Sequence, residues 1–473
     1  MSAPVVLVRR GAYHDSVTLM RVSRALSELP GVTAGMVAMA TELNVSILRD
    51  MGFQAPDAGP SDLVIAVRAD DPDAAAAEAE RLLAAAARPA GTQEAEQPPL
   101  TTRSATARGP ADLVLISTPG EYAFFEALDA VEAGLPVMIF SDGVPVEQER
   151  RLKELAEAKD VLVMGPDCGT SVIAGAGLGF ANVLSPGPVG VVAASGTGAQ
   201  QVTSLLDWAG AGVSHVLGVG GRDLSAEVGG LSTRRALRML DDDPATELIV
   251  LVSKPPSPEV ARSVSEPPLR TPVVRALLGA HGPAAAAAPT AADLTAPDLT
   301  APDLTGPGDL TSAAEAVLRA LGKPVPEWPC WLAEAGPRPA AKTLKGLYAG
   351  GTLSAEAALL AGTGDFVDFG DDAYTRGRAH PMIDPTLRVE ALSRTVETDV
   401  VLMDVVLGHG ADPDPAASLA PAIARTPATV VVALIGTRGD PQDFDRQARA
   451  FREAGASVFV SNAQAARHAR SLL

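Results

Sequence analysis

The stretch VGVVAASGTGAQQVTSLLDWAGAGVSHVLGVGGRD, residues 189–223, decides the fold. It opens with small β-forming residues at 189–193, which predict a buried strand, and breaks at the turn 194–198. An amphipathic pattern then predicts a helix, and a second apolar strand is expected at 215–219, before Gly220-Gly221-Arg222-Asp223. This alternation of strand, helix and strand is typical of an α/β fold.

The glycine-rich turn after the first strand predicts an anion-binding site. A turn of this kind exposes backbone N–H groups at a helix N-terminus, where the aligned peptide dipoles favour negative charge. Ser195 and Thr197 add hydroxyl donors on either side of Gly196. We therefore expect phosphate or carboxylate to bind at Ser195-Gly196-Thr197, with an ordinary tight turn of an α/β sheet as the alternative.

The composition of the whole chain excludes several classes of function. Its 473 residues suggest roughly three or four domains. A net charge of −19 argues against affinity for nucleic acid or an anionic membrane. The two cysteines, Cys168 and Cys330, are far apart and give neither a disulfide framework nor a metal site. With no signal-type segment and no apolar run of about 18 residues, a soluble cytoplasmic protein is expected.

Four folded domains are predicted, separated by two segments without hydrophobic periodicity. The segments between domains are rich in proline, and the second contains the repeat DLTAPDLTAPDLT at 293–305, which cannot bury a core. The expected order is a small N-terminal α/β domain at 1–87, a linker at 88–110, a doubly wound unit at 111–184, an α/β domain at 185–281, a linker at 282–340 and a last α/β domain at 341–473.

The last domain repeats the pattern of residues 189–223. LKGLYAGGTLSAEAALL at 344–360 also predicts a strand, a turn containing Gly and Thr, and a helix. Two later strands and a helix follow in the same order. Two similar modules suggest pseudo-twofold packing, with a second anion-binding turn at Gly350-Gly351-Thr352 facing the first across a shared cleft. Two unrelated units of a generic α/β type are the alternative.

Short loops end the strands of the unit at 111–184. In open α/β sheets ligands bind in the crevice beyond the carboxyl ends of the strands, which makes these loops candidates for cofactor binding. The sequence contains no GxGxxG motif here, which disfavours a nicotinamide dinucleotide. The candidate residues are Thr118, Pro119, Gly120, Asp142, Gly143, Pro166, Asp167 and Cys168.

Several motifs together resemble the FdrA family of the acyl-CoA synthetase superfamily, which is similar to the α subunit of succinyl-CoA synthetase. The motifs are GPDCGTS (165–171), ASGTG (194–198), GVGGRDLS (218–225), KPP (254–256), GLYAGGTLSAEAA (346–358) and RAHPMIDPTLR (378–388). The resemblance implies a CoA-binding-type Rossmann domain at 111–184 and two flavodoxin-like ligase domains. The last domain resembles the carboxy-terminal domain of the synthetase β subunit.

The resemblance also implies ligands. CoA is a possible cofactor at the loops of 111–184, and phosphate is expected at the two glycine-rich turns. The chain has no ATP-grasp domain, so ATP or ADP would be handled only through a partner subunit. The expected partners are a small-molecule acid or amide substrate and further subunits or copies of this chain.

Two departures from the synthetase pattern bear on mechanism. His281, in LLGAHGP, does not match the position of the phosphate-relay histidine. Lys254 stands where the synthetase has a glutamate near that histidine. A carboxylate suits an imidazole, whereas a lysine donates hydrogen bonds only and suits phosphate or carboxylate.

Three functions stay open at this point. The first is an acyl-CoA synthetase-like subunit. The second is an acyl or carbamoyl transferase acting directly with phosphate, since the family resemblance implies a link to ureide catabolism. The third is a ligand-binding subunit without catalysis. For catalysis we expect Lys254 to neutralise phosphate, and Arg222, Asp223, Arg378, His380 and Asp384 to orient the substrate, although each could equally serve as a capping or ion-pair residue.

Overall fold

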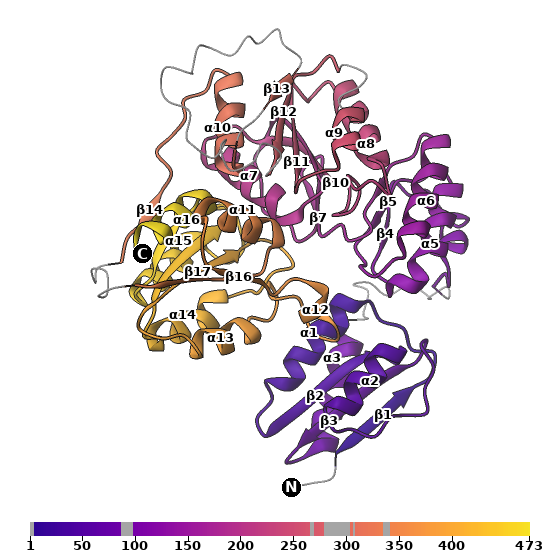
Figure 1. Cartoon of the computed structure of the whole chain (residues 1–473). Coiled ribbons are helices and arrows are strands. Elements are labelled where there is room, and N and C mark those ends of the chain that lie inside the picture. The colour runs from indigo at the N-terminus through magenta and orange to yellow at the C-terminus, as the bar shows by residue number, and fades with distance from the viewer. Residues whose placement is uncertain (1–3, 87–97, 265–268, 279–302, 306–307, 334–340) are drawn as a thin grey trace.

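The computed structural model describes residues 4–86, 98–264, 269–278, 303–305, 308–333 and 341–473. His281 and parts of the linker segments predicted from the sequence lie outside these residues. Figure 1 shows four sheets, each accompanied by helices, arranged as four lobes along the chain. The α/β fold class predicted from the sequence is confirmed.

The N-terminal domain is a three-stranded antiparallel sheet, order β1-β3-β2, with helices on both faces. Asp15 begins the first helix because its Oδ1 accepts a hydrogen bond from Thr18 N at 2.9 Å, which satisfies a donor of the first turn. The elements are β1 (Val5–Arg9), α1 (Ser16–Ser27), β2 (Val32–Met39), α2 (Glu42–Asp50), β3 (Leu63–Ala69) and α3 (Pro72–Ala86).

The second lobe is a parallel three-stranded sheet, order β4-β5-β6, covered by α5 and α6. Its core is formed by small and branched apolar side chains, such as Ala127 and Ile139, which allow close packing of helix on sheet. The elements are α4 (Thr102–Thr106), β4 (Val114–Ile116), α5 (Gly120–Glu132), β5 (Val137–Ile139), α6 (Val146–Ala158) and β6 (Val163–Met164).

A hairpin of β7 (Thr170–Ile173) and β8 (Ala176–Gly179) leaves this lobe and joins the next sheet. β7 pairs antiparallel with β10, so residues expected in the unit at 111–184 extend the sheet of the following domain. The predicted boundary at 184 therefore differs from the structure, in which the second lobe ends before β7. Local periodicity does not reveal that a hairpin pairs with a distant strand.

The third lobe is a seven-stranded sheet, order β13-β12-β11-β9-β10-β7-β8. The central strands β9 and β11 lie under helices on both faces, as their continuous Val and Leu runs predict. Its further elements are β9 (Pro186–Ala193), α7 (Gly196–Trp208), β10 (Val213–Gly218), α8 (Leu231–Asp242), β11 (Leu248–Ser253), α9 (Pro258–Ser263), β12 (Val273–Leu277) and β13 (Asp303–Thr305).

The helix α10 (Leu310–Ala320) lies within the segment predicted as a linker at 282–340. Its residues Leu310, Ala314, Val317 and Leu318 are completely buried, and α10 packs against α7 and β12. This part of the segment therefore belongs to the folded core. The Ala- and Pro-rich composition of the surrounding sequence obscured an 11-residue amphipathic helix capped by Asp309.

The last lobe is a six-stranded sheet, order β14-β19-β18-β17-β15-β16, parallel except for β14. Its central strand β17 is buried along its whole length. The elements are β14 (Cys330–Trp331), β15 (Thr343–Tyr348), α11 (Gly351–Ala361), β16 (Asp365–Asp368), α12 (Asp372–Thr375), α13 (Thr386–Ser393), β17 (Asp399–Val406), α14 (Pro415–Arg425), β18 (Thr429–Ile435), α15 (Phe444–Glu453), β19 (Ser457–Phe459) and α16 (Asn462–Ser471).

The third and last lobes share one topology. The strand order β10-β9-β11-β12-β13 matches β16-β15-β17-β18-β19, and both follow the 2-1-3-4-5 order of flavodoxin-like sheets. The repeated sequence pattern therefore reflects a repeated fold. The two lobes also share a continuous apolar core, and Gln201 fixes their contact by donating to Val460 O at 3.1 Å and accepting from Asn462 N at 2.8 Å.

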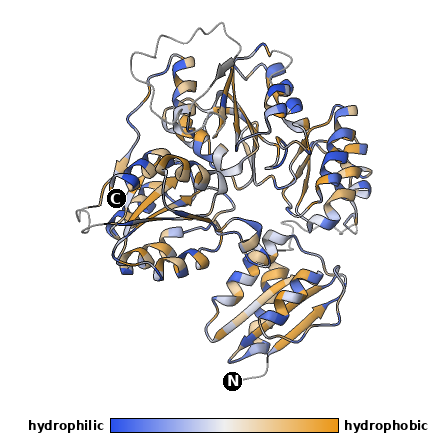
Figure 2. Cartoon of the chain, in the orientation of Figure 1, coloured by the Kyte–Doolittle hydropathy of each residue, from blue (hydrophilic) through white to orange (hydrophobic). Residues whose placement is uncertain are grey.

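Apolar residues follow the strands, and polar residues follow the outer faces of the helices (Figure 2). No helix among the residues that the structure describes has the length and apolarity needed to cross a membrane.

Candidate functional site

The two glycine-rich turns predicted from the sequence meet at the contact between the two flavodoxin-like domains. Ser195 is the N-cap of α7: its Oγ accepts a hydrogen bond from Gly198 N at 3.0 Å and donates one to Thr352 Oγ1 at 2.7 Å. A Cβ added to Gly350 would lie 2.6 Å from Thr197 Oγ1, so only glycine fits there. Figure 1 shows α7 and α11 beside each other, and their N-termini face each other within one chain.

The first turns of these helices keep free donors. The backbone N–H groups of Gly196, Thr197, Gly351 and Thr352 have no acceptor among the residues that the structure describes. The positive ends of the two helix dipoles converge at the same place. The arrangement therefore suits an anion that accepts several hydrogen bonds at once.

Asp404 fixes the turn before α11, and sequence reasoning missed it. Its Oδ1 accepts from Ala349 N at 2.7 Å and its Oδ2 from Gly350 N at 2.9 Å. Burial raises the pKa of Asp404 to about 6, while the nearby Arg388 and these two N–H groups act in the opposite direction. An aspartate inside the apolar strand DVVLMDVV is the signal that could have identified it, since a buried carboxylate requires partners.

Lys254 follows β11 and lies beside the N-terminus of α11. A Cβ added to Gly351 would lie 3.1 Å from Lys254 Nζ and would also contact Asp368 Oδ2. The lysine is exposed and makes no hydrogen bond or ion pair with any residue in the described part of the chain. An uncommitted ammonium group thus lies next to the free N–H groups.

Carboxylates surround this lysine on the other sides. Asp368 ends β16, and its Oδ1 accepts from Gly370 N at 2.9 Å. Burial raises the pKa of Asp368, and the positive charge of Lys254 opposes that rise. The charges of Asp142 and Asp372 act on Asp167, which also interacts with the charge of Lys254. The charged side chains around Lys254 therefore include more carboxylates than cations.

Asp167 is a further carboxylate near Lys254. It has a left-handed backbone with φ 58°, and its side chain has no hydrogen-bond partner among the described residues. The surrounding protein raises its pKa to about 6, first by desolvation and then through Asp142 and Asp372, against the opposing charges of Lys254 and Arg222. A carboxyl with this pKa exchanges a proton near neutral pH.

Arg222 and Asp223 hold the loop between β10 and α8 in place. Arg222 donates to Val144 O at 2.7 Å and lies 2.9 Å from Glu149 Oε2. Asp223 is fully buried: its Oδ1 lies 2.7 Å from Lys153 Nζ and its Oδ2 accepts from Thr233 N at 2.8 Å. The structure thus uses Asp223 as an ion-pair and capping residue, out of reach of a substrate.

His380 lies behind the loop that carries Asp368. Its Nδ1 accepts from Met382 N at 3.2 Å, and its ring packs against Phe180 with centroids 5.6 Å apart. Burial, and secondarily Arg388, lowers the pKa of His380 to about 4, so the imidazole is neutral at physiological pH. A neutral, packed histidine is placed to support the loop.

The expected CoA loops fall into two groups. Thr118 Oγ1 is buried without a partner among the described residues, and Gly120 contacts the backbone of the Asp142-Gly143 loop so closely that a side chain would clash. These residues lie together at the ends of β4 and β5. The second group is the Pro166–Cys168 turn, which packs against residues 218–221.

Cys168 itself is buried in the core, and its thiol contacts Gly218 O at 3.3 Å. Burial raises the pKa of Cys168 to about 11, which keeps the thiol protonated. It is therefore a packing residue in this structure.

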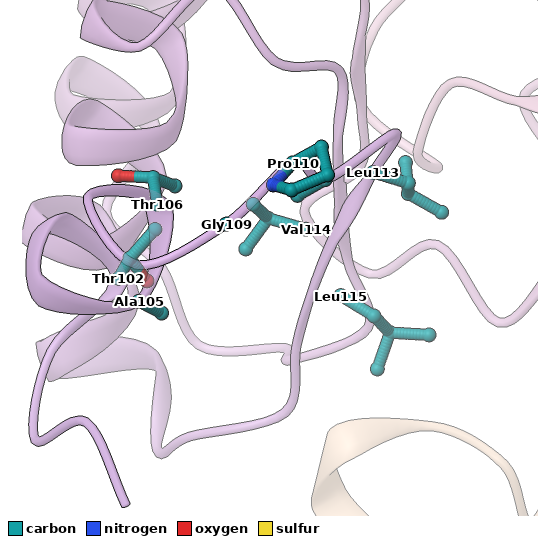
Figure 3. Close-up of a pocket in the computed structure, with 9 residues that line it drawn as sticks. Thr102, Ala105, Thr106, Gly109, Pro110, Leu113, Val114 and Leu115 are labelled. Carbon is teal, nitrogen blue, oxygen red and sulfur yellow. The ribbon is translucent and has the colours of Figure 1, made fainter.

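A cavity of about 330 Å³ beside β4 lies away from the turns (Figure 3). Pro110, Leu113, Val114 and Leu115 form most of its lining, together with α4. It offers no charged group. No cluster of three or more metal-binding side chains occurs in the part of the chain that the structure describes.

Comparison with known proteins identifies the family. A model described as CoA-ligase matches residues 347–472, and one described as "AllF, heavy metal-associated domain" matches residues 1–99. The uncharacterized protein YahF of Escherichia coli K12 is 36% identical, over 99% of this chain and 98% of YahF. The chain belongs to the YahF-like, FdrA-type family of the acyl-CoA synthetase superfamily. The family predicted from the sequence is confirmed.

More distant relatives match parts of the chain. Succinate–CoA ligase [ADP-forming] subunit alpha 2 of Archaeoglobus fulgidus is 28% identical over 33% of this chain and 54% of that subunit. A solved dinucleotide-forming acetyl-coenzyme A synthetase 1 from Ca. Korarchaeum cryptofilum, in complex with phosphate and ADP, is 18% identical with a TM-score of 0.29, over 77% of this chain and 82% of that chain. The segment matching the heavy metal-associated model contains no cysteine.

Proposed function

We propose that this chain is an acyl-CoA synthetase-like subunit that binds a phosphate-type dianion at the joined N-termini of α7 and α11. The acyl group would be transferred between that anion and CoA, and nucleotide would be supplied by a partner subunit. The observation that carries the proposal is the Ser195–Thr352 hydrogen bond, which joins two free helix N-termini beside the unpaired Lys254.

Each part of the site has a stated task in this proposal. The N–H groups of the two turns hold the anion, and Lys254 neutralises it and the charge that develops on the acyl oxygen. Asp404 and Ser195 keep the turns rigid, so little reorganisation is needed during the reaction. No histidine is required as a phosphate carrier in this scheme.

The CoA site is proposed at the loops ending β4 and β5. The orphaned hydroxyl of Thr118 and the N-terminus of α5, which has no side-chain cap, are free to contact a phosphate-bearing ligand. The CoA thiol supplies the acyl carrier. Asp167 interacts electrostatically with both Asp142 and Lys254, which supports a CoA site near the proposed anion site.

Direct acyl or carbamoyl transfer from an amide substrate to phosphate is the second candidate. It is favoured by Lys254, because a lysine at this position cannot hold a phosphorylated imidazole as a carboxylate would. Both candidates need the same anion site and differ in whether CoA binds. A chain that binds ligands without turnover is the third possibility.

Calorimetric titration of the full chain with phosphate and with CoA tests the proposal. Lys254→Ala should weaken phosphate binding about tenfold, as expected for loss of one charged hydrogen bond. Lys342→Ala is the matched control, because Lys342 is exposed and precedes β15, at the end of that strand away from Gly350 and Gly351.

Unchanged phosphate affinity in Lys254→Ala would contradict the proposed anion site. Binding of phosphate without binding of CoA would instead favour direct transfer from an amide. Binding of both without acyl transfer in the presence of the partner subunit would favour the ligand-binding function.

A further inference from the structure

A cavity of about 750 Å³ separates the N-terminal domain from the last domain. One wall comes from α1, the edge strand β2 and α2, and the other comes mainly from residues 377–390, with Phe369, Ser418 and, from the second lobe, Pro119 completing the lining. Its volume falls in the range of about 300–1,000 Å³ that is usual for small-molecule sites. It is distinct from the joined helix N-termini described above.

Specific contacts hold the two walls in place around this cavity. Arg24 of α1 donates to Ile383 O and lies 3.4 Å from Asp412 Oδ2. Ser16 Oγ, at the start of α1, donates to Ser117 O of the second lobe at 3.2 Å. Figure 1 shows α1 next to α12 at this junction. The cavity is therefore bounded by defined interdomain contacts.

The wall formed by the N-terminal domain is mainly apolar and rich in thioethers. Met20, Met36, Met39 and Met51 all line it, which is four of the ten methionines in the chain. Unbranched methionine side chains adapt to ligands of irregular shape. This wall suits an apolar body and offers little specificity for its shape.

The acidic side chains of the lining are all engaged within the protein. Glu28 accepts a hydrogen bond from Arg24 Nε at 3.0 Å. Arg24 therefore also has a partner within the protein. Asp384 accepts from Thr386 N at 3.0 Å. Glu390 pairs with Arg394, the residue that follows α13, at 3.5 Å. These groups are satisfied without a ligand.

Arg378 is the charged lining residue that is not engaged. Its side chain has no hydrogen bond or ion pair with any residue that the structure describes, and it is exposed to solvent in the cavity wall. A guanidinium group binds a carboxylate through two parallel hydrogen bonds. Among the charged lining residues that the structure describes, Arg378 thus offers a cation without a protein partner beside an apolar, adaptable wall.

We propose that this cavity binds a small organic carboxylate, with its carboxylate on Arg378 and its apolar body against the methionines of the N-terminal domain. The site does not depend on the anion site at α7 and α11. It gives the N-terminal domain a direct part in ligand binding, because neither wall encloses the cavity alone.

The cavity also adjoins the loop that carries Asp368. Two residues that line the cavity show this: Phe369 directly follows Asp368, and Ala379 directly precedes His380. A bound carboxylate would therefore contact the same loop that borders Lys254.

Calorimetry with hexanoate and its neutral isostere hexanamide tests the proposal on the full chain. We expect hexanoate to bind the wild type, and Arg378→Gln to weaken it about tenfold, as for loss of a charged hydrogen-bond pair. Hexanamide should bind both proteins with equal affinity. Arg376→Gln, an exposed arginine two positions away that does not line the cavity, should bind hexanoate like the wild type.

A second variant addresses the other wall. Ser27→Trp places a large ring at the lining of α1 and should reduce the affinity for both hexanoate and hexanamide. Failure of hexanoate to bind the wild type, or equal hexanoate affinity in the wild type and Arg378→Gln, would overturn the proposal. Phosphate binding should be unaffected by Arg378→Gln, so the result stands apart from the test of the anion site.

Discussion

The protonation state of Asp167 changes the net charge of the side chains around Lys254. Its pKa of about 6 lies well above the ordinary value for an aspartate, because desolvation and the neighbouring carboxylates disfavour ionisation. A bound dianion would add to this repulsion and raise the pKa further. Binding of an anion should therefore be accompanied by uptake of a proton.

The pH dependence of sulfate binding tests this coupling, because sulfate remains a dianion throughout the range. As pH falls from about 8 to about 5, Asp167 gains a proton and sulfate affinity should rise by about tenfold. Asp167→Asn should bind sulfate more tightly at high pH and lose most of the pH dependence. Asp365→Asn, an exposed residue at the start of β16, serves as control. An unchanged pH profile in Asp167→Asn would show that another group governs the binding.

The sequence predicted many of the residues at this scale and left open whether they bind substrate or serve as structural residues. Ser195, Thr197 and the glycines 350 and 351 could be predicted because a turn between strand and helix is a local pattern. Asp223 could not be distinguished from a substrate-binding residue, because its partner Lys153 lies 70 positions earlier. Whether the predicted residues bind ligands stays a prediction.

The start of α11 depends on a carboxylate from another strand. α7 has a local cap in Ser195, whereas the N-cap of α11 is Gly350, which offers no side chain, and its N–H is bound instead by Asp404 of β17. The two equivalent helices thus use different means to orient their N-terminal donors.

Replacement of Asp404 by alanine should therefore destabilise the last domain. It would leave two buried N–H groups unsatisfied and the buried Arg388 without its carboxylate partner, at a cost of about 3–5 kcal/mol. Denaturant unfolding measures this loss, and Asp365→Ala is the exposed control, expected to change stability by less than about 0.5 kcal/mol. A loss below about 1 kcal/mol in Asp404→Ala would show that Asp404 does not hold the turn.

Periodicity identified the buried strands and amphipathic helices, and it failed where an element depends on distant partners. β9 and β17 are recognisable as continuous apolar runs because both faces are covered. The β7–β8 hairpin is short and acquires its place through pairing with β10. α10 lies between proline-rich segments, and its burial depends on α7 and β12.

At the scale of the whole molecule, the repeated topology explains how one chain forms a two-sided site. Each flavodoxin-like domain contributes one helix N-terminus, and packing of the domains joins the two. The repeat was visible in the sequence, but the contact was not, since Ser195 and Thr352 are 157 positions apart. The position of the N-terminal domain was equally hidden, because Arg24 meets Ile383 across 359 positions.

A crystal structure of the full chain grown with sulfate tests the central claim most directly. The account predicts one anion within hydrogen-bond distance of the N–H groups of Gly196 or Thr197 and of Gly351 or Thr352, with Lys254 Nζ as a further donor. Crystals in which this position holds only water, while sulfate binds elsewhere, would contradict the claim that the joined helix N-termini form an anion site.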